Sequence, residues 1–218
     1  MRTISEAAKA LPQMLSGREL MAAMTVLPDY DEFIRNESPS VRLMALSDLY
    51  RVYLPSQMSG EIYSKLYLAL LRSLQKKGTK LAVLQQNQNY RAIHGMEYSG
   101  ILGGSDSFTI IGTSGIGKSS AISRALELIA ARGIIDIDEP YAKIIPCVVV
   151  QCPFDSSVRG LLLEILRKID EWLQSTFYSD ALRAKATVDM LIGSVSQIAL
   201  NHVGCWWYPY SFPSELRI

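Results

Sequence analysis

The chain has 218 residues, enough to bury a sizeable core in one or two domains, and 49% of them are apolar, which is ordinary for a globular protein. Its net charge is +1 and neither half is strongly basic, so charge alone provides no argument for binding nucleic acid. No apolar run reaches the ~18 residues of a membrane helix, and the N-terminus lacks the apolar stretch of a signal peptide. We therefore expect no membrane partner and a cytoplasmic location.

Residues 1–100 are predicted to form a mostly helical N-terminal region. One helix begins at Ser38-Pro39, because serine is a good N-cap and proline fits the first helical position. Apolar residues follow at roughly helical spacing until Leu54-Pro55 ends the pattern. A second helix is predicted over residues 59–77, closed by Gly78. One face of this helix carries four apolar residues at regular spacing: Ile62, Leu66, Leu70 and Leu74.

The residues after this helical region alternate between strand and helix signals. Residues 85–106 are rich in Gln, Asn and Gly, and are predicted to be a loop and a domain boundary. A β-prone run at 108–111 leads into a glycine-rich segment and a helix closed by Gly133. An apolar strand at 144–151 and helices at 157–173 and 186–201 follow. This alternation predicts an α/β fold with a parallel sheet.

The glycine-rich segment at 112–119 matches the pattern Gly-x-x-x-x-Gly-Lys-Ser in full. Its glycines let the backbone turn tightly toward phosphates, while successive N–H groups and the start of the next helix favour anionic oxygens. Lys118 is expected to reach the β- and γ-phosphates, and the Ser119 hydroxyl is expected to bind Mg²⁺. A glycine-rich turn with an exposed lysine is the alternative. The predicted nucleotide-binding residues are Gly112, Thr113, Ser114, Gly115, Ile116, Gly117, Lys118, Ser119 and Ser120.

The other metal-ligating residue types are interpreted as structural. Three cysteines are too few for a disulfide framework, and Cys147 and Cys152 bracket an apolar run, so we expect buried thiols. Zinc is not expected, because neither histidine is close to them in sequence. Asp136, Asp138 and Glu139 are predicted to form a solvated turn in preference to a metal site.

Residues 145–161 form a pattern that indicates a particular protein family. An apolar strand is followed by Cys152-Pro-Phe-Asp-Ser-Ser157 and by a helix that continues through Ile169-Asp170. This stretch resembles the TniB/TnsC family of transposition ATPases, which are AAA+ proteins that choose target DNA for a transposase. Thr187-Val-Asp-Met-Leu191 and His202-Val-Gly204 also resemble the family, as does Leu27-Pro-Asp-Tyr30. The resemblance covers roughly residues 25–204.

The resemblance implies an incomplete AAA+ P-loop NTPase core, a parallel sheet with flanking helices, preceded by the helical N-terminal region. It implies binding of ATP and Mg²⁺, a homo-oligomer when the protein is full length, and partners that include duplex DNA and transposase or target-selection proteins. By position it places Ser156, Ser157 and Arg159 against the DNA backbone. The compatible alternative is that Ser156 or Ser157 caps its helix.

The sequence departs from the family after Gly204. There the family has four apolar residues and then Asp-Glu, the Walker B pair that holds Mg²⁺ and polarises water. This chain reads Cys205-Trp-Trp-Tyr208 followed by a proline-containing tail without Asp-Glu. The family implies an ATPase, but we expect little or no hydrolysis and assign no catalytic residue. A truncated or frameshifted gene is the favoured explanation, and a natural short paralogue is the other.

These predictions divide the chain into a helical region at 1–100, a partial AAA+ nucleotide-binding domain at 101–204 and a divergent tail at 205–218. In the family's strand order 5-1-4-3-2, strands 1 and 2 are not neighbours, so the apolar run at 144–150 is expected to be an unpaired edge. A non-enzymatic binding module that keeps partner contacts through its N-terminal helices is the alternative function. A small-molecule kinase is a third possibility, and the Cys-Pro-x-Asp-x-Ser segment argues against it.

Overall fold

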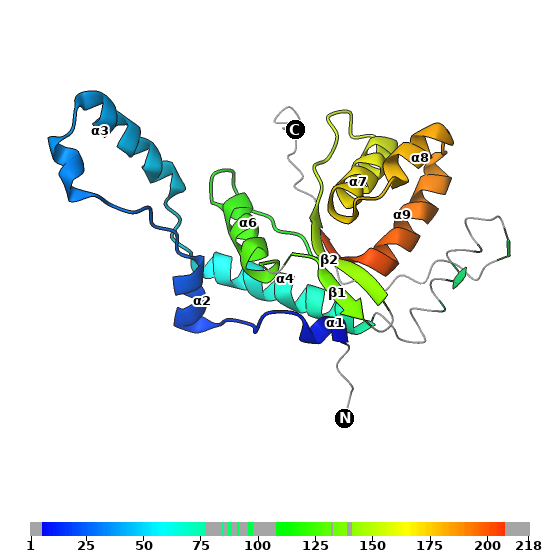
Figure 1. Cartoon of the computed structure of the whole chain (residues 1–218). Coiled ribbons are helices and arrows are strands. Elements are labelled where there is room, and N and C mark those ends of the chain that lie inside the picture. The colour runs from blue at the N-terminus through cyan, green and yellow to red at the C-terminus, as the bar shows by residue number, and fades with distance from the viewer. Residues whose placement is uncertain are drawn as a thin grey trace. The chain divides into compact units, whose positions relative to one another are not determined.

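The computed structural model describes residues 6–76, 84, 87–88, 91, 96–97, 108–131, 133–138 and 141–207, which form a mixed α/β protein (Figure 1). The chain divides into two compact units. The first, called here the sheet unit, comprises Met1–Pro12, Tyr67–Thr109 and Ile129–Ile218. The second, called the loop unit, comprises Gln13–Leu66 and Ile110–Leu128.

The sheet unit contains a small mixed sheet with the order β1-β2-β3. Its central strand, β2 (Tyr141–Val149), pairs antiparallel with β1 (Ile135–Asp138) and parallel with β3 (Val203–Trp207). Cys147 lies opposite Cys205 in the parallel pair. The expectation of an unpaired apolar edge at 144–150 is therefore wrong. The two tryptophans at 206–207 are β-prone, so this segment can form the partner strand without the family's aliphatic sequence.

Two predictions are wrong at β1: that the sheet is parallel, and that Asp136 and Asp138 lie in a turn. Asp136 and Asp138 lie within this strand, and Ile135 pairs with Ile144 of β2. The segment Ile-Asp-Ile-Asp alternates apolar and acidic residues, which is the strand period, so that Ile135 is buried while Asp136 is exposed. Glu139, the third member of the predicted acidic group, lies outside the described residues.

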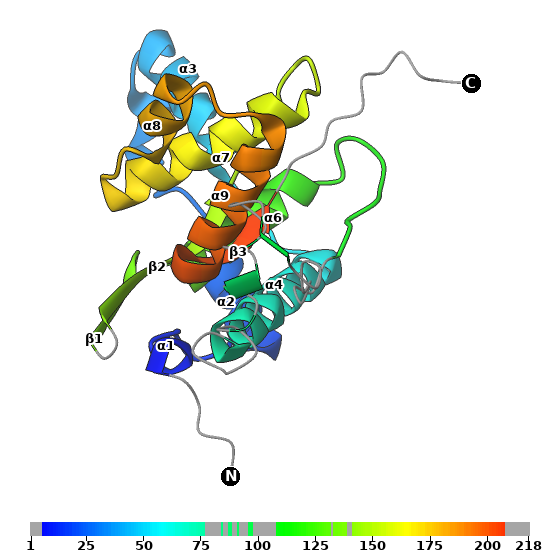
Figure 2. The ribbon, with the colours of Figure 1, turned by 90° about the vertical axis from the view of Figure 1, so that its right-hand side faces the viewer.

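Three helices of the sheet unit lie together in Figures 1 and 2: α7 (Val158–Leu173), α8 (Phe177–Arg183) and α9 (Val188–His202). Helices α7 and α9 confirm the predicted helices at 157–173 and 186–201, and both pack against β2. Helix α8 was not predicted. The buried core that joins these helices to the sheet is apolar throughout: Ile145, Val148, Val150, Leu162, Ile165, Leu166, Ile169, Ala186, Leu191, Val195 and Val203.

Asp170 joins α7 to α8. One of its carboxylate oxygens accepts hydrogen bonds from the Ser175 hydroxyl (2.6 Å) and the Phe177 N–H (3.0 Å), and the other accepts from the Tyr178 N–H (2.8 Å). The Phe177 and Tyr178 N–H groups lie in the first turn of α8 and have no partner within that helix. The N-cap residue Thr176 makes no side-chain capping bond, so Asp170 supplies the acceptors instead. The Ile-Asp pair of the family resemblance thus has a structural role in this chain.

Gly204 allows β3 to lie close to β2. A Cβ atom at this position would lie 2.5 Å from the carbonyl oxygen of Pro146 and would also overlap the side chain of Leu70. Because the nearest obstacle on β2 is backbone, it cannot move aside by a rotamer change. The strand pairing therefore requires glycine here.

The loop unit is built on helices. It contains α2 (Gly17–Met24), α3 (Pro39–Leu46), the first part of α4 (Gln57–Lys76) and nearly all of α6 (Lys118–Ile129). Short 3₁₀ helices, η1 (Glu32–Asn36) and η2 (Ser47–Arg51), flank α3.

Helix α4 confirms the predicted second helix, and all four residues of its predicted apolar face are buried: Ile62, Leu66, Leu70 and Leu74. Helix α3 begins at Pro39 as predicted but gives way to η2 at Ser47. The predicted stop at Gly78 lies outside the described residues, as do most residues of the loop predicted at 85–106. Among the described residues of that segment, 87, 88 and 91 are helical, so the prediction of a loop is wrong there.

The strand predicted at residues 108–111 is not formed. A strand needs a neighbour for its backbone N–H and C=O groups, and no described strand pairs with this run. Ile111 is consequently 91% exposed. None of the described helices combines the length and apolar character that crossing a bilayer would require.

Candidate nucleotide-binding site

The predicted phosphate loop is a turn between residues 108–113, which have no regular secondary structure, and helix α6, which begins at Lys118. Gly115 (φ +81°) and Gly117 (φ +87°) have backbone conformations that residues with an L side chain rarely adopt. Within the described chain, no hydrogen bond occupies the backbone N–H groups of residues 114–117. A loop whose successive N–H groups are free, at the positive end of a helix, can bind an anion.

Lys118 folds back over this loop. Its ammonium group donates hydrogen bonds to the carbonyl oxygens of Gly112 (2.7 Å) and Thr113 (2.6 Å). These bonds close the seven residues 112–118 into a ring and keep a cation beside the free N–H groups. The structure thus brings the ammonium group of the predicted lysine onto the glycine-rich turn. Adjacency in sequence alone would not have determined where this side chain lies.

Helix α6 is held in the loop unit by two kinds of contact. Ala121, Ile122 and Ala125 are buried on one face. In addition, the guanidinium group of Arg124 donates to the carbonyl oxygens of Met24 (3.0 Å) and Ala23 (3.1 Å) at the end of α2. These carbonyls have no intrahelical donor, so the arginine caps α2. Sequence reasoning missed Arg124 because its partners lie about a hundred residues earlier.

Ser119 and Ser120 follow Lys118 in the first turn of α6, and both are exposed. An exposed hydroxyl at 119 is compatible with binding Mg²⁺ beside a phosphate. The described residues contain no group of three or more His, Cys, Asp or Glu side chains placed to hold a metal ion. A metal here would therefore have to share its coordination with the nucleotide and water.

The second predicted site, the loop between β2 and α7, belongs to the sheet unit. Ser157 is the N-cap of α7, and its hydroxyl oxygen accepts a hydrogen bond from the Gly160 N–H (3.1 Å). This confirms the capping alternative for Ser157. Ser156 has φ +51° and is exposed, and its N–H donates to the carbonyl oxygen of Pro153 (2.9 Å). Contact of either serine with DNA stays a prediction.

Acidic and apolar groups occupy the tip of this loop. The Asp155 carboxylate accepts a hydrogen bond from the Ser157 N–H (3.1 Å), which is the main reason that the pKa of Asp155 lies below its ordinary value. The neighbouring Phe154 is fully exposed. The third predicted DNA ligand, Arg159, donates to the carbonyl oxygen of Ala186 (2.7 Å) and so links α7 to the start of α9. This loop is not a concentrated positive surface.

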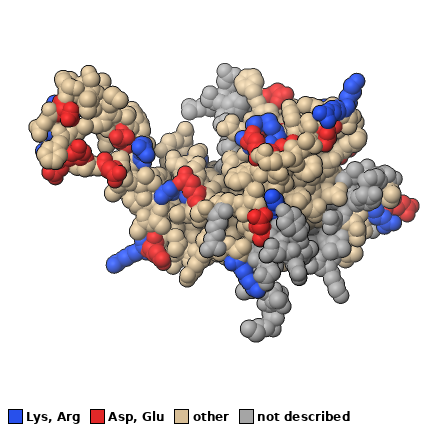
Figure 3. Space-filling model, viewed as in Figure 1, with Lys and Arg blue, Asp and Glu red and all other residues tan. Residues whose placement is uncertain are grey.

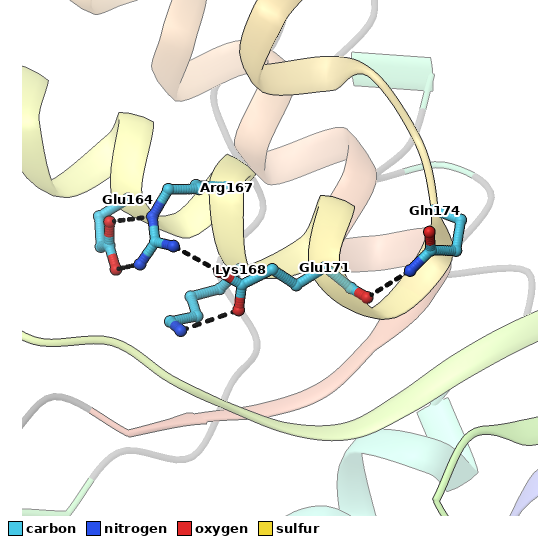
Figure 4. Close-up of polar contacts among 5 residues, drawn as sticks. All are labelled: Glu164, Arg167, Lys168, Glu171 and Gln174. Atoms are coloured by element: carbon cyan, nitrogen blue, oxygen red, sulfur yellow. Dashed lines mark hydrogen bonds and ion pairs between the residues drawn. The ribbon is translucent and has the colours of Figure 1, made fainter.

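Two of the three basic residues of α7, Arg167 and Lys168, are neutralised within the helix (Figure 4). Arg167 contacts Glu164 (2.5 Å) and Glu171, and Lys168 contacts Glu171 (2.8 Å). The bond from Arg167 is the main cause of the lowered pKa of Glu164. Pairs three and four residues apart stabilise a helix modestly. The described surface of α7 consequently provides no unpaired basic stripe for a phosphate backbone.

Cys147 is buried, as predicted, whereas Cys152 is only half-buried. Both are free thiols.

Comparison with known proteins adds no family to these observations: no protein-family model matches the chain, and no curated protein matches it significantly. The resemblance to transposition ATPases therefore remains a hypothesis that depends on the motifs quoted above.

Proposed function

We propose that this protein binds ATP with Mg²⁺ at residues 112–119 and acts in the target-selection step of a DNA transposition system. The observation that carries nucleotide binding is the closed loop of residues 112–118, with two left-handed glycines, free N–H groups and a lysine at the start of a helix. The link to transposition depends on the resemblance of the β2–α7 segment alone. Duplex DNA and transposase or target-selection proteins are its proposed partners, and a homo-oligomer its proposed full-length state.

In this proposal the N–H groups of residues 114–117 bind phosphate oxygens, Lys118 contributes a cation, and the Ser119 hydroxyl binds the metal ion. Bound Mg²⁺ would neutralise phosphate charge. Hydrolysis also needs a group that positions water and a carboxylate beside the metal. The residues that follow β3, Tyr208-Pro-Tyr-Ser211, include neither Asp nor Glu. We therefore propose binding with little or no turnover.

Titration of the protein with a fluorescent ATP analogue and Mg²⁺ tests this proposal. Lys118→Ala should weaken binding by about ten- to a hundredfold, because it removes a charge-assisted hydrogen bond. Lys65→Ala is the matched control: this lysine is exposed, lies in the same unit and makes no hydrogen bond or ion pair with the described residues. Equal affinity of the wild type and Lys118→Ala would show that the site is assigned wrongly.

Phosphate release, measured with and without duplex DNA, tests the expected lack of turnover. We expect rates near background in both conditions, since each missing ~1.4 kcal/mol of transition-state stabilisation lowers the rate tenfold. Robust release that Lys118→Ala abolishes would show that another group positions the water.

A second candidate function, a non-enzymatic binding module, is favoured by one observation in the loop unit. No residue between 27 and 52 is buried, and large apolar side chains are exposed throughout this segment. Such a surface is typical of contact with another protein. Under this alternative, Lys118→Ala would leave partner binding unchanged.

A further inference from the structure

The base of the segment 27–52 lies at the end of α2 (Figure 1). Val26 and Tyr53 form an isolated antiparallel bridge there, and both backbone hydrogen bonds between them are 2.9 Å long. The segment itself contains no buried residue, and mostly uncharged atoms with scattered acidic groups cover its face in Figure 3. Because no buried side chain holds this segment, its position depends on its base.

The bridge forms where α2 ends. In a continuing α-helix the Val26 N–H would donate to the carbonyl oxygen of Ala22, whereas here it donates to Tyr53. Ending the helix leaves its last carbonyl oxygens without helical donors. The helical donor to Met24 would be residue 28, which is a proline and has no N–H. The end of α2 therefore needs donors from another part of the chain.

Arg124 of α6 supplies these donors. Its Nε donates to the carbonyl oxygen of Met24 (3.0 Å) and one Nη to that of Ala23 (3.1 Å). The other Nη pairs with Glu127 of the same helix (2.5 Å). The planar guanidinium group offers two donors to two neighbouring carbonyl groups at once. The end of α2, and with it the start of the bridge, thus depends on a residue of α6.

The same helix begins at the proposed phosphate loop. Lys118 is the first residue of α6, and Arg124 follows six residues later, about 9 Å along the helix axis. Both residues belong to the loop unit. Ala121 and Ile122, which lie between them, are buried. One packed stretch of helix therefore carries the phosphate loop at its start and the cap of α2 on its second turn.

A ligand at the loop would oppose opening of this stretch. Helix ends open locally with small free energies, and an open first turn no longer presents the N–H groups that bind phosphate. When the opening reaches the second turn, Arg124 also leaves the carbonyl groups of α2. A ligand that binds only the closed state lowers the population of the open states by the factor 1 + [L]/Kd. It therefore stabilises every contact that is lost in the same opening.

We propose that Arg124 couples the phosphate loop to the base of the segment 27–52, so that a phosphate-bearing ligand at residues 112–118 stabilises the bridge between Val26 and Tyr53. This inference rests on the proposed nucleotide binding and adds a response of the protein to it. Arg124 is a positioning residue, because it acts through the carbonyl groups of α2 and not on the ligand.

Amide hydrogen exchange of the whole chain, followed by NMR, tests the coupling. The amides of Val26 and Tyr53 are the reporters, because each donates to the carbonyl oxygen of the other. With Mg²⁺-ATP at about 100 times its dissociation constant, exchange at both should slow by at least about tenfold, with an upper limit of about a hundredfold. The amide of Ile34, which donates to Asp31 inside the segment, is the internal control and should not change.

Three variants test the role of Arg124 at equal ligand occupancy. Arg124→Ala should speed exchange at both reporters without ligand and should abolish the slowing by ligand. Arg124→Lys keeps a cation that can donate to a carbonyl group, so it should restore part of the slowing. Glu127→Gln is the matched control: it removes the ion pair of Arg124 but leaves both bonds to α2, so it should behave like the wild type. Circular dichroism checks the fold of each variant.

The coupling and the nucleotide site can fail separately. Binding of Mg²⁺-ATP to the wild type without slower exchange at Val26 and Tyr53 would overturn the coupling and leave the site intact. This comparison needs no variant, so it decides even where a variant does not fold. Slowing that persists undiminished in Arg124→Ala would show that another contact carries it. Absence of binding in the titration would overturn the proposed function and the coupling together.

Discussion

Removing the carboxylate of Asp170 should destabilise the sheet unit strongly, although this side chain is only half-buried. The carboxylate accepts three hydrogen bonds, two of them from backbone N–H groups of α8. A hydrogen bond to a charged group contributes about 1.5–3 kcal/mol, but the Ser175 hydroxyl can turn to water, and part of the loss is recovered by solvation. We expect Asp170→Ala to lower the free energy of unfolding by about 2–4 kcal/mol.

Urea unfolding followed by circular dichroism measures this loss. Asp170→Asn keeps one acceptor oxygen but turns an amide N–H₂ toward a backbone donor, so it should lose about half as much. Asp136→Ala is the control, because this exposed carboxylate of β1 makes no hydrogen bond or ion pair with the described residues. A loss below about 0.5 kcal/mol for Asp170→Ala, which is the range of ordinary surface substitutions, would refute the capping role.

Three further predictions concern the same unit. Gly204→Ala should lower the free energy of unfolding by about 1–3 kcal/mol, because its Cβ would meet backbone at 2.5 Å, and a melting temperature equal to that of the wild type would contradict this. Ser157→Ala should cost about 1 kcal/mol through the lost cap of α7, measured by urea unfolding, whereas Ser156→Ala should be nearly neutral. Glu164 has a folded pKa below its ordinary value of 4.5, so its contribution to stability is complete above that value and is lost as pH falls through the folded pKa. Glu164→Gln should therefore be less stable than the wild type at pH 6 and equally stable in strong acid. A stability difference that does not change with pH would contradict the ion pair.

The helices that carry local signals were predictable from the sequence. The buried face of α4, the Ser157 cap of α7 and the extent of α9 each depend on residues within a few positions of one another. The glycine-rich turn before α6 is of the same kind, because its glycines, lysine and helix start lie within eight residues; its binding of phosphate stays a prediction. Local spacing was enough because helical hydrogen bonds and caps join residues three or four apart.

The tertiary structure decided the strands, the joints and the exposed surfaces. Residues 108–111 have strand propensity but pair with none of the described strands, whereas 205–207 form a strand because β2 lies beside them. Arg124 binds carbonyl groups about a hundred residues earlier, which its own sequence neighbourhood does not identify. The partners of Asp170 lie five to eight residues ahead, beyond the helical spacing of three or four. The apolar residues of the segment 27–52 have roughly the spacing of a buried helix, yet none is buried. A strand, a long-range hydrogen bond or a core needs a second surface, and only the folded chain supplies one.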